Sequence, residues 1–233
     1  MTTNNLNLAR MQAAALFVHD EGERLLCVNE PDPSEPAPRF FLARTSAGNL
    51  WRTRCDLPAG LATELERLAA GEPVTGDLQG PAYHMAEYTA LLGQHQPVTH
   101  VEAGPAYYLP ELEPPSGAVT ITTANLSLVE AYYPYTRSMY AELAPVVACI
   151  ADGVAVAVCF SARITAQVAE AGVHTVEAYR GRGYGAETVR GWATELRAMG
   201  RLPLYSTSWE NAASRAVARK LGAVQYAVDL SIE

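Results

Sequence analysis

The chain has 233 residues, of which 49% are apolar and 18% charged, so it is long enough for one large or two small globular domains. Its formal net charge of −8 makes nucleic acid a poor partner, because a broadly acidic surface repels phosphate backbones. The sequence has no apolar run of about 18 residues and no charged leader of the secretory type, so we expect a cytoplasmic protein without a membrane span.

The first 112 residues are predicted to form an α+β domain. Two apolar runs flank residues 20–23, a pattern typical of a hairpin. Leu61, Leu65 and Leu68 share one face of a predicted helix. The other predicted elements are a proline-rich loop over 31–39, strands over 39–44, 49–55 and 105–111, and a second helix over 82–92.

Prolines and a glycine interrupt the helix and strand patterns over residues 111–117. We place a domain border there, which gives an N-terminal α+β domain over 1–112 and a second domain over 118–233. No cofactor-binding turn is visible in the first domain, so we assign it no chemistry.

The second domain begins with a short predicted strand, and Asn125 is expected to cap the helical stretch that follows it. Asp152–Gly153 is the turn of a hairpin over 145–163. Gly172 lies inside the next strand, where a glycine marks a bulge or a close backbone approach. The elements predicted here are strands over 119–122, 166–176, 202–208 and 223–233, and helices after Pro134, from Ala186 to Gly200 and over 211–222.

The cysteines and histidines do not form a metal or disulfide pattern. Cys27, Cys55, Cys149 and Cys159 are scattered without CxxC spacing, which is typical of buried thiols in a reducing compartment. The histidines include no HExxH pair, so we predict no metal site.

The segment 180–186, Arg-Gly-Arg-Gly-Tyr-Gly-Ala, follows a predicted strand and opens a predicted helix. Such a place exposes main-chain N–H groups at the positive end of a helix dipole. Glycines let the backbone approach a ligand closely and adopt a positive φ. Arg180 and Arg182 add charge that can pair with phosphate. Together these features predict a cradle for a phosphate or pyrophosphate group.

Two other interpretations of the same segment are open. Gly181, Gly183 and Ala186 satisfy the G-x-G-x-x-G/A pattern of dinucleotide folds. That pattern expects an acidic residue at the end of the next strand, and the predicted strand over 202–208 has no carboxylate. The remaining alternative is a glycine-rich surface turn whose arginines are merely solvated.

Two motifs in the second half of the chain resemble the GNAT acetyltransferase superfamily. The first is R/Q-x-x-G-x-G/A after a strand, matched by Arg180, Gly183 and Gly185. The second is an asparagine that opens a helix ending in Lys-Leu-Gly, matched over 211–222. The resemblance covers residues 118–233 and implies an α/β fold with a mixed sheet. The first domain is either a separate smaller α+β unit or a degenerate GNAT-like half.

The resemblance implies that acetyl-CoA, the cosubstrate, binds where two central strands splay apart. The matching strands here are 167–176 and 202–207. Main-chain groups of the first strand are expected to contact the pantetheine arm, the glycine turn to hold the pyrophosphate, and the opening of the last helix to touch the arm. The residues implied are Val173, His174, Thr175, Arg180, Gly181, Arg182, Gly183, Tyr184, Gly185, Ala186, Asn211 and Ser214.

Each of these side chains also has a plain structural interpretation. Asn211 can serve only as a helix N-cap, a role that asparagine fills well. Ser214 can lie on the helix surface without touching a ligand. A histidine on a strand, such as His174, is more often packed than catalytic.

The reaction that the resemblance implies is direct attack of an amine on a thioester, which needs a base for the amine and often an acid for the departing thiolate. We expect Glu170 to be the base, because it lies in a largely apolar strand beside the implied cleft. The alternative is an exposed or salt-bridged glutamate, with Arg163 as its partner. His174, Tyr205 and Ser206 are reserve candidates. The family's usual acid, a tyrosine four residues before the glycine of Lys-Leu-Gly, is replaced by Ala218.

The sequence thus predicts an N-acetyltransferase that acts on the primary amine of a small molecule. The alternative is a non-catalytic acyl-CoA-binding sensor, which Ala218 keeps open. GNAT domains usually have one more strand after the last one here. The edge so exposed is covered by the N-terminal unit, by a second copy in a homodimer, or by nothing.

Overall fold

The computed structural model describes residues 4–31 and 35–233, so part of the predicted loop over 31–39 lies outside the described residues. The chain divides into two compact units. The first comprises Met1–Tyr107, Ser206–Asn211 and Gln225–Glu233, and the second comprises Tyr108–Tyr205 and Ala212–Val224. The predicted assignment of 1–112 and 118–233 to separate domains stays a prediction, because compactness does not show which parts fold alone.

The first unit contains a sheet with the strand order β4-β3-β11-β5. These strands are β3 (Phe40–Thr45), β4 (Gly48–Thr53), β5 (Val101–Tyr108) and β11 (Val224–Ile232). β3 pairs antiparallel with both β4 and β11. The Glu233 N–H donates to the His100 carbonyl, so the end of β11 lies beside the start of β5. Both edges of β11 are therefore covered by strands of the N-terminal half. Of the three alternatives for that edge, coverage by the N-terminal unit is the one that the structure shows.

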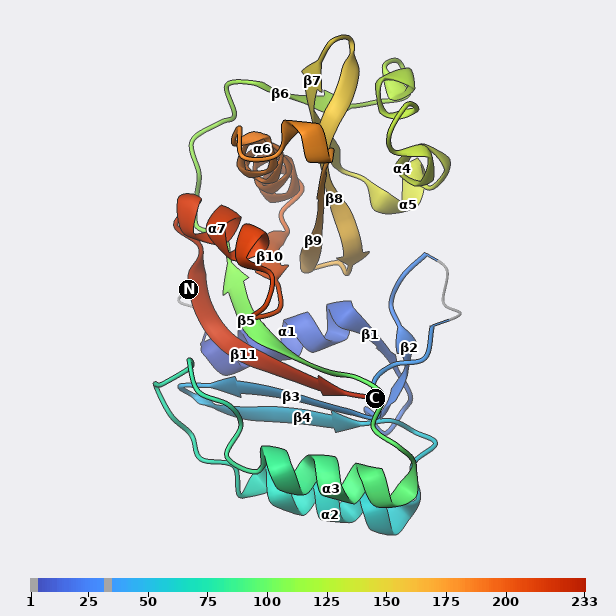
Figure 1. Cartoon of the computed structure of the whole chain (residues 1–233), viewed down its shortest axis with the longest axis vertical. Helices are drawn as coiled ribbons and strands as arrows, with labels where there is room; N and C mark the ends of the chain where they lie inside the picture. The colour runs from blue at the N-terminus through green and yellow to red at the C-terminus, as the bar shows by residue number, and fades with distance from the viewer. Residues whose placement is uncertain (1–3, 32–34) are drawn as a thin grey trace. The chain divides into compact units, whose positions relative to one another are not determined.

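Helices cover both faces of this sheet, as Figure 1 shows. α2 (Ala59–Ala70) and α3 (Met85–His95) pack on one face, where Phe40, Leu42, Leu230 and Ile232 are buried. α1 (Asn5–Leu16) lies on the other, and its buried Gln12 side chain accepts a hydrogen bond from Tyr226 Oη at 2.8 Å. The predicted hairpin is confirmed as β1 (Phe17–His19) and β2 (Leu25–Val28), and it follows α1, a helix that the sequence analysis does not predict.

β5 is held closely by the segment 206–211 of the same unit. The N–H groups of Thr207 and Trp209 donate to the carbonyls of Pro105 and Ala103. A Cβ built at Gly104 would lie 1.8 Å from the Thr207 carbonyl oxygen, a distance at which the backbone itself must move. Only glycine therefore fits at this position of β5.

We expect Gly104→Ala to destabilise the protein by about 3 kcal/mol, because the added methyl forces two hydrogen-bonded backbone segments apart. The control is Gly93→Ala in α3, where an added Cβ meets nothing within 4 Å. That variant should gain about 0.5–1 kcal/mol from helix propensity. Urea denaturation of both variants checks the pair, and equal midpoints would contradict the close approach at Gly104.

The second unit contains a mixed sheet with the strand order β10-β9-β8-β7-β6. Its strands are β6 (Ala118–Ile121), β7 (Val146–Ala151), β8 (Val154–Ile164), β9 (Val168–Thr175) and β10 (Leu202–Ser206). β10 pairs parallel with β9, and the other neighbours pair antiparallel. The helical segments are η1 (Leu126–Val129), α4 (Pro134–Ser138), α5 (Tyr140–Leu143), η2 (Glu177–Tyr179), α6 (Tyr184–Ala198) and α7 (Ala212–Lys220). The predicted α/β class with a mixed sheet is confirmed.

Two details of this unit correct the sequence analysis. The Asn125 side chain does not cap η1; its Oδ1 instead accepts the Thr122 N–H at 2.6 Å, because it folds back onto the preceding turn. The bulge lies in β8, between Ser161 and Arg163, and not at Gly172. Gly172 makes room for an aromatic ring instead, since a Cβ there would lie 2.5 Å from the Phe160 ring.

The described residues contain no helix that is both long and apolar enough to cross a membrane. The four cysteines are free thiols: Cys149 and Cys159 are buried, and Cys27 and Cys55 are half-buried.

Candidate functional site

β9 and β10 separate part of the way along their length. Their paired residues run from Leu202 and Val168 to Leu204 and Glu170, and no pairing follows on either described strand. β9 continues to Thr175, still paired with β8 on its other side. The bulge of β8 stands opposite the same point, between the partners of Ala171 and Glu170. The two strands therefore form a fork whose branch point is Glu170.

Beyond the fork, one edge of β9 presents main-chain groups that β10 does not pair. The Val176 N–H donates to the Val156 carbonyl, and antiparallel pairing then turns the main chain of His174 toward β8. By the same alternation, the N–H and C=O groups of Val173 and Thr175 face the open edge. An extended ligand can add there like a strand.

The main chain of His174 pairs with β8, and its side chain packs against an aromatic ring. The imidazole stacks on Phe160, with ring centroids 5.7 Å apart and planes 13° from parallel. Partial burial lowers the pKa of His174 below its usual value, so the ring is neutral near pH 7. Its predicted share in ligand contact stays a prediction.

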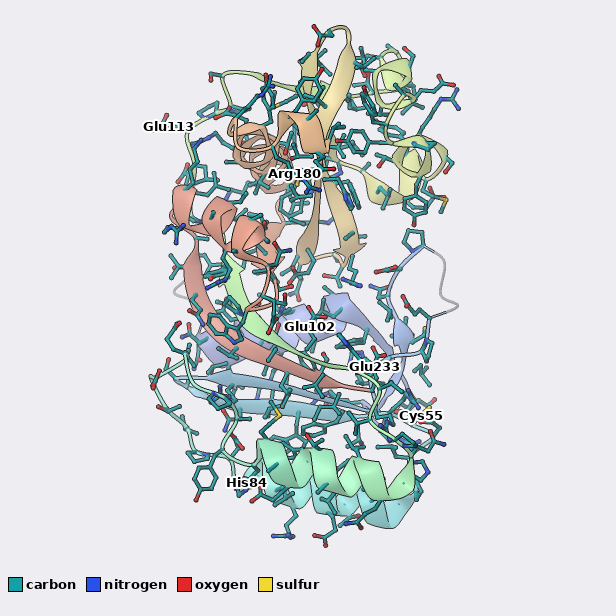
Figure 2. The ribbon with its side chains drawn as sticks, viewed as in Figure 1. Cys55, His84, Glu102, Glu113, Arg180 and Glu233 are labelled. Atoms are coloured by element: carbon teal, nitrogen blue, oxygen red, sulfur yellow. The ribbon has the colours of Figure 1, made fainter. Side chains whose placement is uncertain are left out.

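The glycine turn joins η2 to α6, and Figure 2 labels Arg180 at its start. Gly181 and Gly183 have φ of 76° and 88°, in the left-handed region that favours glycine. Gly183 is the N-cap residue of α6 without a side-chain cap, and its carbonyl accepts the first helical hydrogen bond, from the Glu187 N–H. The N–H groups of residues 184–186 therefore point out of the helix start, as an anion site requires.

The two arginines of the turn are held by local contacts. Arg180 Nε donates to the Thr175 carbonyl at 3.4 Å, and Arg182 Nη2 donates to the Ala178 carbonyl at 3.2 Å. The Arg182 guanidinium also lies 5.1 Å from the centroid of the Tyr179 ring, whose hydroxyl donates to Asp152 Oδ2 at 2.8 Å. Both arginines are exposed to solvent, and these contacts keep their side chains near the start of α6.

Lys220, which the sequence analysis did not assign, brings a third cation to the turn. A Cβ built at Gly183 would lie 2.7 Å from Lys220 Nζ. The ammonium is therefore beside the backbone at the start of α6, where it adds to the charge of Arg180 and Arg182. The signal was present in the Lys-Leu-Gly motif, but the lysine lies far along the chain from the turn, and only the packing of α7 brings the two together.

α7 closes the same side of the fork with two adjacent faces. A Cβ built at Gly185 would lie 3.7 Å from Val217 of α7. The same Cβ would lie 3.4 Å from Thr175 and 3.8 Å from Val173 of β9. On the neighbouring face, Ser214 Oγ lies 2.7 Å from the Tyr205 hydroxyl of β10. Ala218, at the position where the family carries a tyrosine, is only 1% exposed.

The structure brings together the predicted residues of β9, the glycine turn and Ser214 within the second unit. Glu170 is 2% exposed, which agrees with its expected burial. Arg163 is the residue directly opposite Glu170 in the backbone register of β8 and β9. Asn211 is grouped with the first unit, at the residue before α7 begins, so its predicted contact with a ligand stays a prediction. Among the described residues, no group of three or more His, Cys, Asp or Glu side chains could hold a metal ion.

No protein-family model matches the chain, and no curated protein does. Solved structures do resemble it. A Drosophila protein matches with a TM-score of 0.50 and 14% identity over 82% of this chain and 72% of its own. A GNAT-family acetyltransferase from Colwellia psychrerythraea matches with a TM-score of 0.46 and 16% identity over 79% and 76%. A GCN5-related N-acetyltransferase from Kribbella flavida matches with a TM-score of 0.43 and 18% identity over 64% and 63%.

Proteins described as members of the GNAT family are among the matched structures, all at TM-scores below 0.5. The chain spans less than two thirds of the length of several matched structures, with coverages of 60%, 63% and 65%. At these identities the likeness concerns the fold alone.

Proposed function

We propose that the protein is an acetyl-CoA-dependent N-acetyltransferase whose acceptor is the primary amine of a small molecule. The observation that carries this proposal is the position of the β9–β10 fork relative to the glycine turn. Glu170 at the branch point and Thr175 at the end of β9 are five residues apart, roughly 16 Å along a strand. An extended pantetheine arm can span that length, with its thioester at the fork and its pyrophosphate at the turn.

The residues of the turn fit a pyrophosphate. The start of α6 supplies main-chain N–H groups, and Arg180, Arg182 and Lys220 supply positive charge beside them. A side chain at Gly183 would fill the space beside Lys220 Nζ, where we place the pyrophosphate. The open edge of β9 supplies the main-chain groups that an amide-containing arm can pair with.

The proposed reaction uses Glu170 at the branch point and the main chain of the open edge of β9. The acceptor amine must lose a proton before its nitrogen attacks the thioester carbon, and Glu170 is the carboxylate at that point. As the new C–N bond forms and the C–S bond breaks, an N–H group of the open edge can polarise the carbonyl oxygen. The products are the N-acetylated amine and free CoA.

The test combines binding with turnover. Calorimetric titration with acetyl-CoA should show one site per chain, and a thiol-detecting reagent should report CoA release in the presence of an accepted amine. The amine panel includes a polyamine, an aminoglycoside, amino acids and a peptide amino terminus. Because the chain has four free cysteines, the reagent is run against protein alone as the blank.

The buried Ala218 favours one second candidate, a non-catalytic acyl-CoA sensor, since the usual acid is absent from α7. Tight binding of acetyl-CoA with no thiol release for any amine would support the sensor. Absence of CoA binding would refute both functions.

A further inference from the structure

The proposed reaction leaves one proton unassigned, and the following inference rests on that proposed function. A thiolate departs from the thioester, and an acid beside it accelerates the step. Position 218 offers only a methyl group, and that methyl is 1% exposed within the packing of α7. Position 218 therefore supplies no acid, and a proton donor is sought on the other elements of the second unit.

Tyr205 stands at the required place on β10. It directly follows Leu204, the last residue of β10 that pairs with β9, so it is the first residue beyond the branch point of the fork. Its side chain is 3% exposed. Its hydroxyl oxygen lies 2.7 Å from Ser214 Oγ and also donates to the Ser214 carbonyl at 3.4 Å.

The residues of α7 that contact Tyr205 and the glycine turn show where the Tyr205 hydroxyl lies along the site. Ser214 and Ala218 are four residues apart and so share one face of the helix on successive turns. Val217 and Lys220 lie on the adjacent face, against the glycine turn. Along the helix axis, Ser214 is about 9 Å from Lys220 toward the fork. The Tyr205 hydroxyl is thus displaced from the proposed pyrophosphate end toward the proposed thioester end.

We propose that Tyr205 is the general acid of this site, a phenol supplied by β10 in place of a side chain at position 218. Its hydroxyl proton passes to the sulfur as the C–S bond breaks. The phenolate that remains is stabilised by the Ser214 hydroxyl and regains a proton from water. The ammonium proton leaves through Glu170 before attack, and the second proton of the nitrogen passes to water as the amide forms. The net reaction converts thioester and ammonium into amide, thiol and one released proton. Ser214 is a positioning residue, which holds the phenol by its hydroxyl.

A Tyr205 with a purely structural role would make the same contact with Ser214, because buried tyrosine hydroxyls usually find a hydrogen-bond partner. The two roles differ in what removal of the hydroxyl changes. A packing hydroxyl affects stability alone. An acid affects turnover, and the effect depends on how much the leaving sulfur needs a proton.

The experiment compares Tyr205→Phe with wild type on two acetyl donors. With acetyl-CoA and an accepted amine, kcat should fall about 100-fold while the KM for acetyl-CoA changes less than threefold. The fall of kcat at high pH, which reports loss of the phenolic proton, should disappear. With S-acetyl-thiophenol, whose weakly basic thiolate departs without a proton, the two rates should agree within about twofold.

Ser214→Ala should lower kcat less than Tyr205→Phe does, and Ser214→Thr, which keeps a hydroxyl, should restore it. The matched control is Tyr140→Phe, which removes a hydroxyl that donates to the Ile121 carbonyl at 2.9 Å. That variant should lose stability but not kcat.

An equal loss with both donors, or unchanged kcat in Tyr205→Phe, would overturn the assignment while leaving the proposed acetyltransferase intact. Wild type that binds acetyl-CoA but acetylates no amine would overturn both.

Discussion

Replacement of Glu170 by glutamine is expected to lower kcat by a factor of about 100 to 1,000, which is the usual contribution of a positioned general base. Glu170 is 2% exposed and sits at the branch point of the fork, so the isosteric glutamine keeps the packing and removes only the carboxylate. Affinity for acetyl-CoA should change less than twofold, because the proposed pyrophosphate and pantetheine contacts lie along β9 and the turn. Single-turnover kinetics and calorimetric titration measure the two quantities.

The pH profile separates a base from a merely structural carboxylate. If Glu170 accepts the amine proton, the acidic limb of kcat/KM contains the ionisation of its carboxyl, and that limb should lose one ionisation in Glu170→Gln. The control is Glu195→Gln on α6, whose carboxylate accepts the Thr120 hydroxyl at 2.8 Å outside the fork. Unchanged kcat in Glu170→Gln would rule Glu170 out as the base, and lost CoA affinity would assign it a structural role.

The glycine turn could be located from sequence because its signals are local. A positive φ at Gly181 and Gly183 and the capping of α6 depend on neighbouring residues, and all of them fall within one short segment. The hairpin turn at Asp152–Gly153 was found for the same reason, and both of its residues have positive φ. Signals of this kind do not require knowledge of which strands pair.

The features that were missed depend on contacts between distant residues. Lys220 reaches Gly183 only because α7 packs beside the start of α6, and no local pattern marks that contact. The Tyr205–Ser214 pair joins β10 to α7 in the same way. Gly172 indicates either a bulge or a close approach, and the bulge itself lies in β8, because a bulge depends on the register of two strands.

α1 was missed for a different reason. The apolar run from Ala14 onward reads as one arm of the predicted hairpin, although the strand begins only at Phe17. The Asn4 side chain accepts the Leu6 N–H and starts a helix that runs directly into that strand without a polar break. Helix and strand periodicity are hard to separate where one apolar element continues into the next.

Replacement of Gly183 by valine is expected to weaken CoA binding at least 100-fold. Gly183 has a φ of 88°, and its added side chain would occupy the space beside Lys220 Nζ. The strained φ costs about 1–2 kcal/mol of stability on its own, so a control must carry the same strain. Gly200→Val serves, because Gly200 has a φ of 75° just beyond the other end of α6 and no neighbour within 4 Å of an added Cβ.

The comparison of these two variants isolates the role of the turn. Both should lose similar stability in thermal unfolding, but only Gly183→Val should lose CoA in calorimetric titration. With S-acetyl-pantetheine, which lacks the pyrophosphate, Gly183→Val should turn over an accepted amine at the wild-type rate, because the fork is intact. A loss of CoA binding in both variants would trace the effect to strain in α6. Normal CoA binding by Gly183→Val would show that the pyrophosphate does not lie at the start of this helix, and the proposed direction of the ligand along β9 would then be wrong.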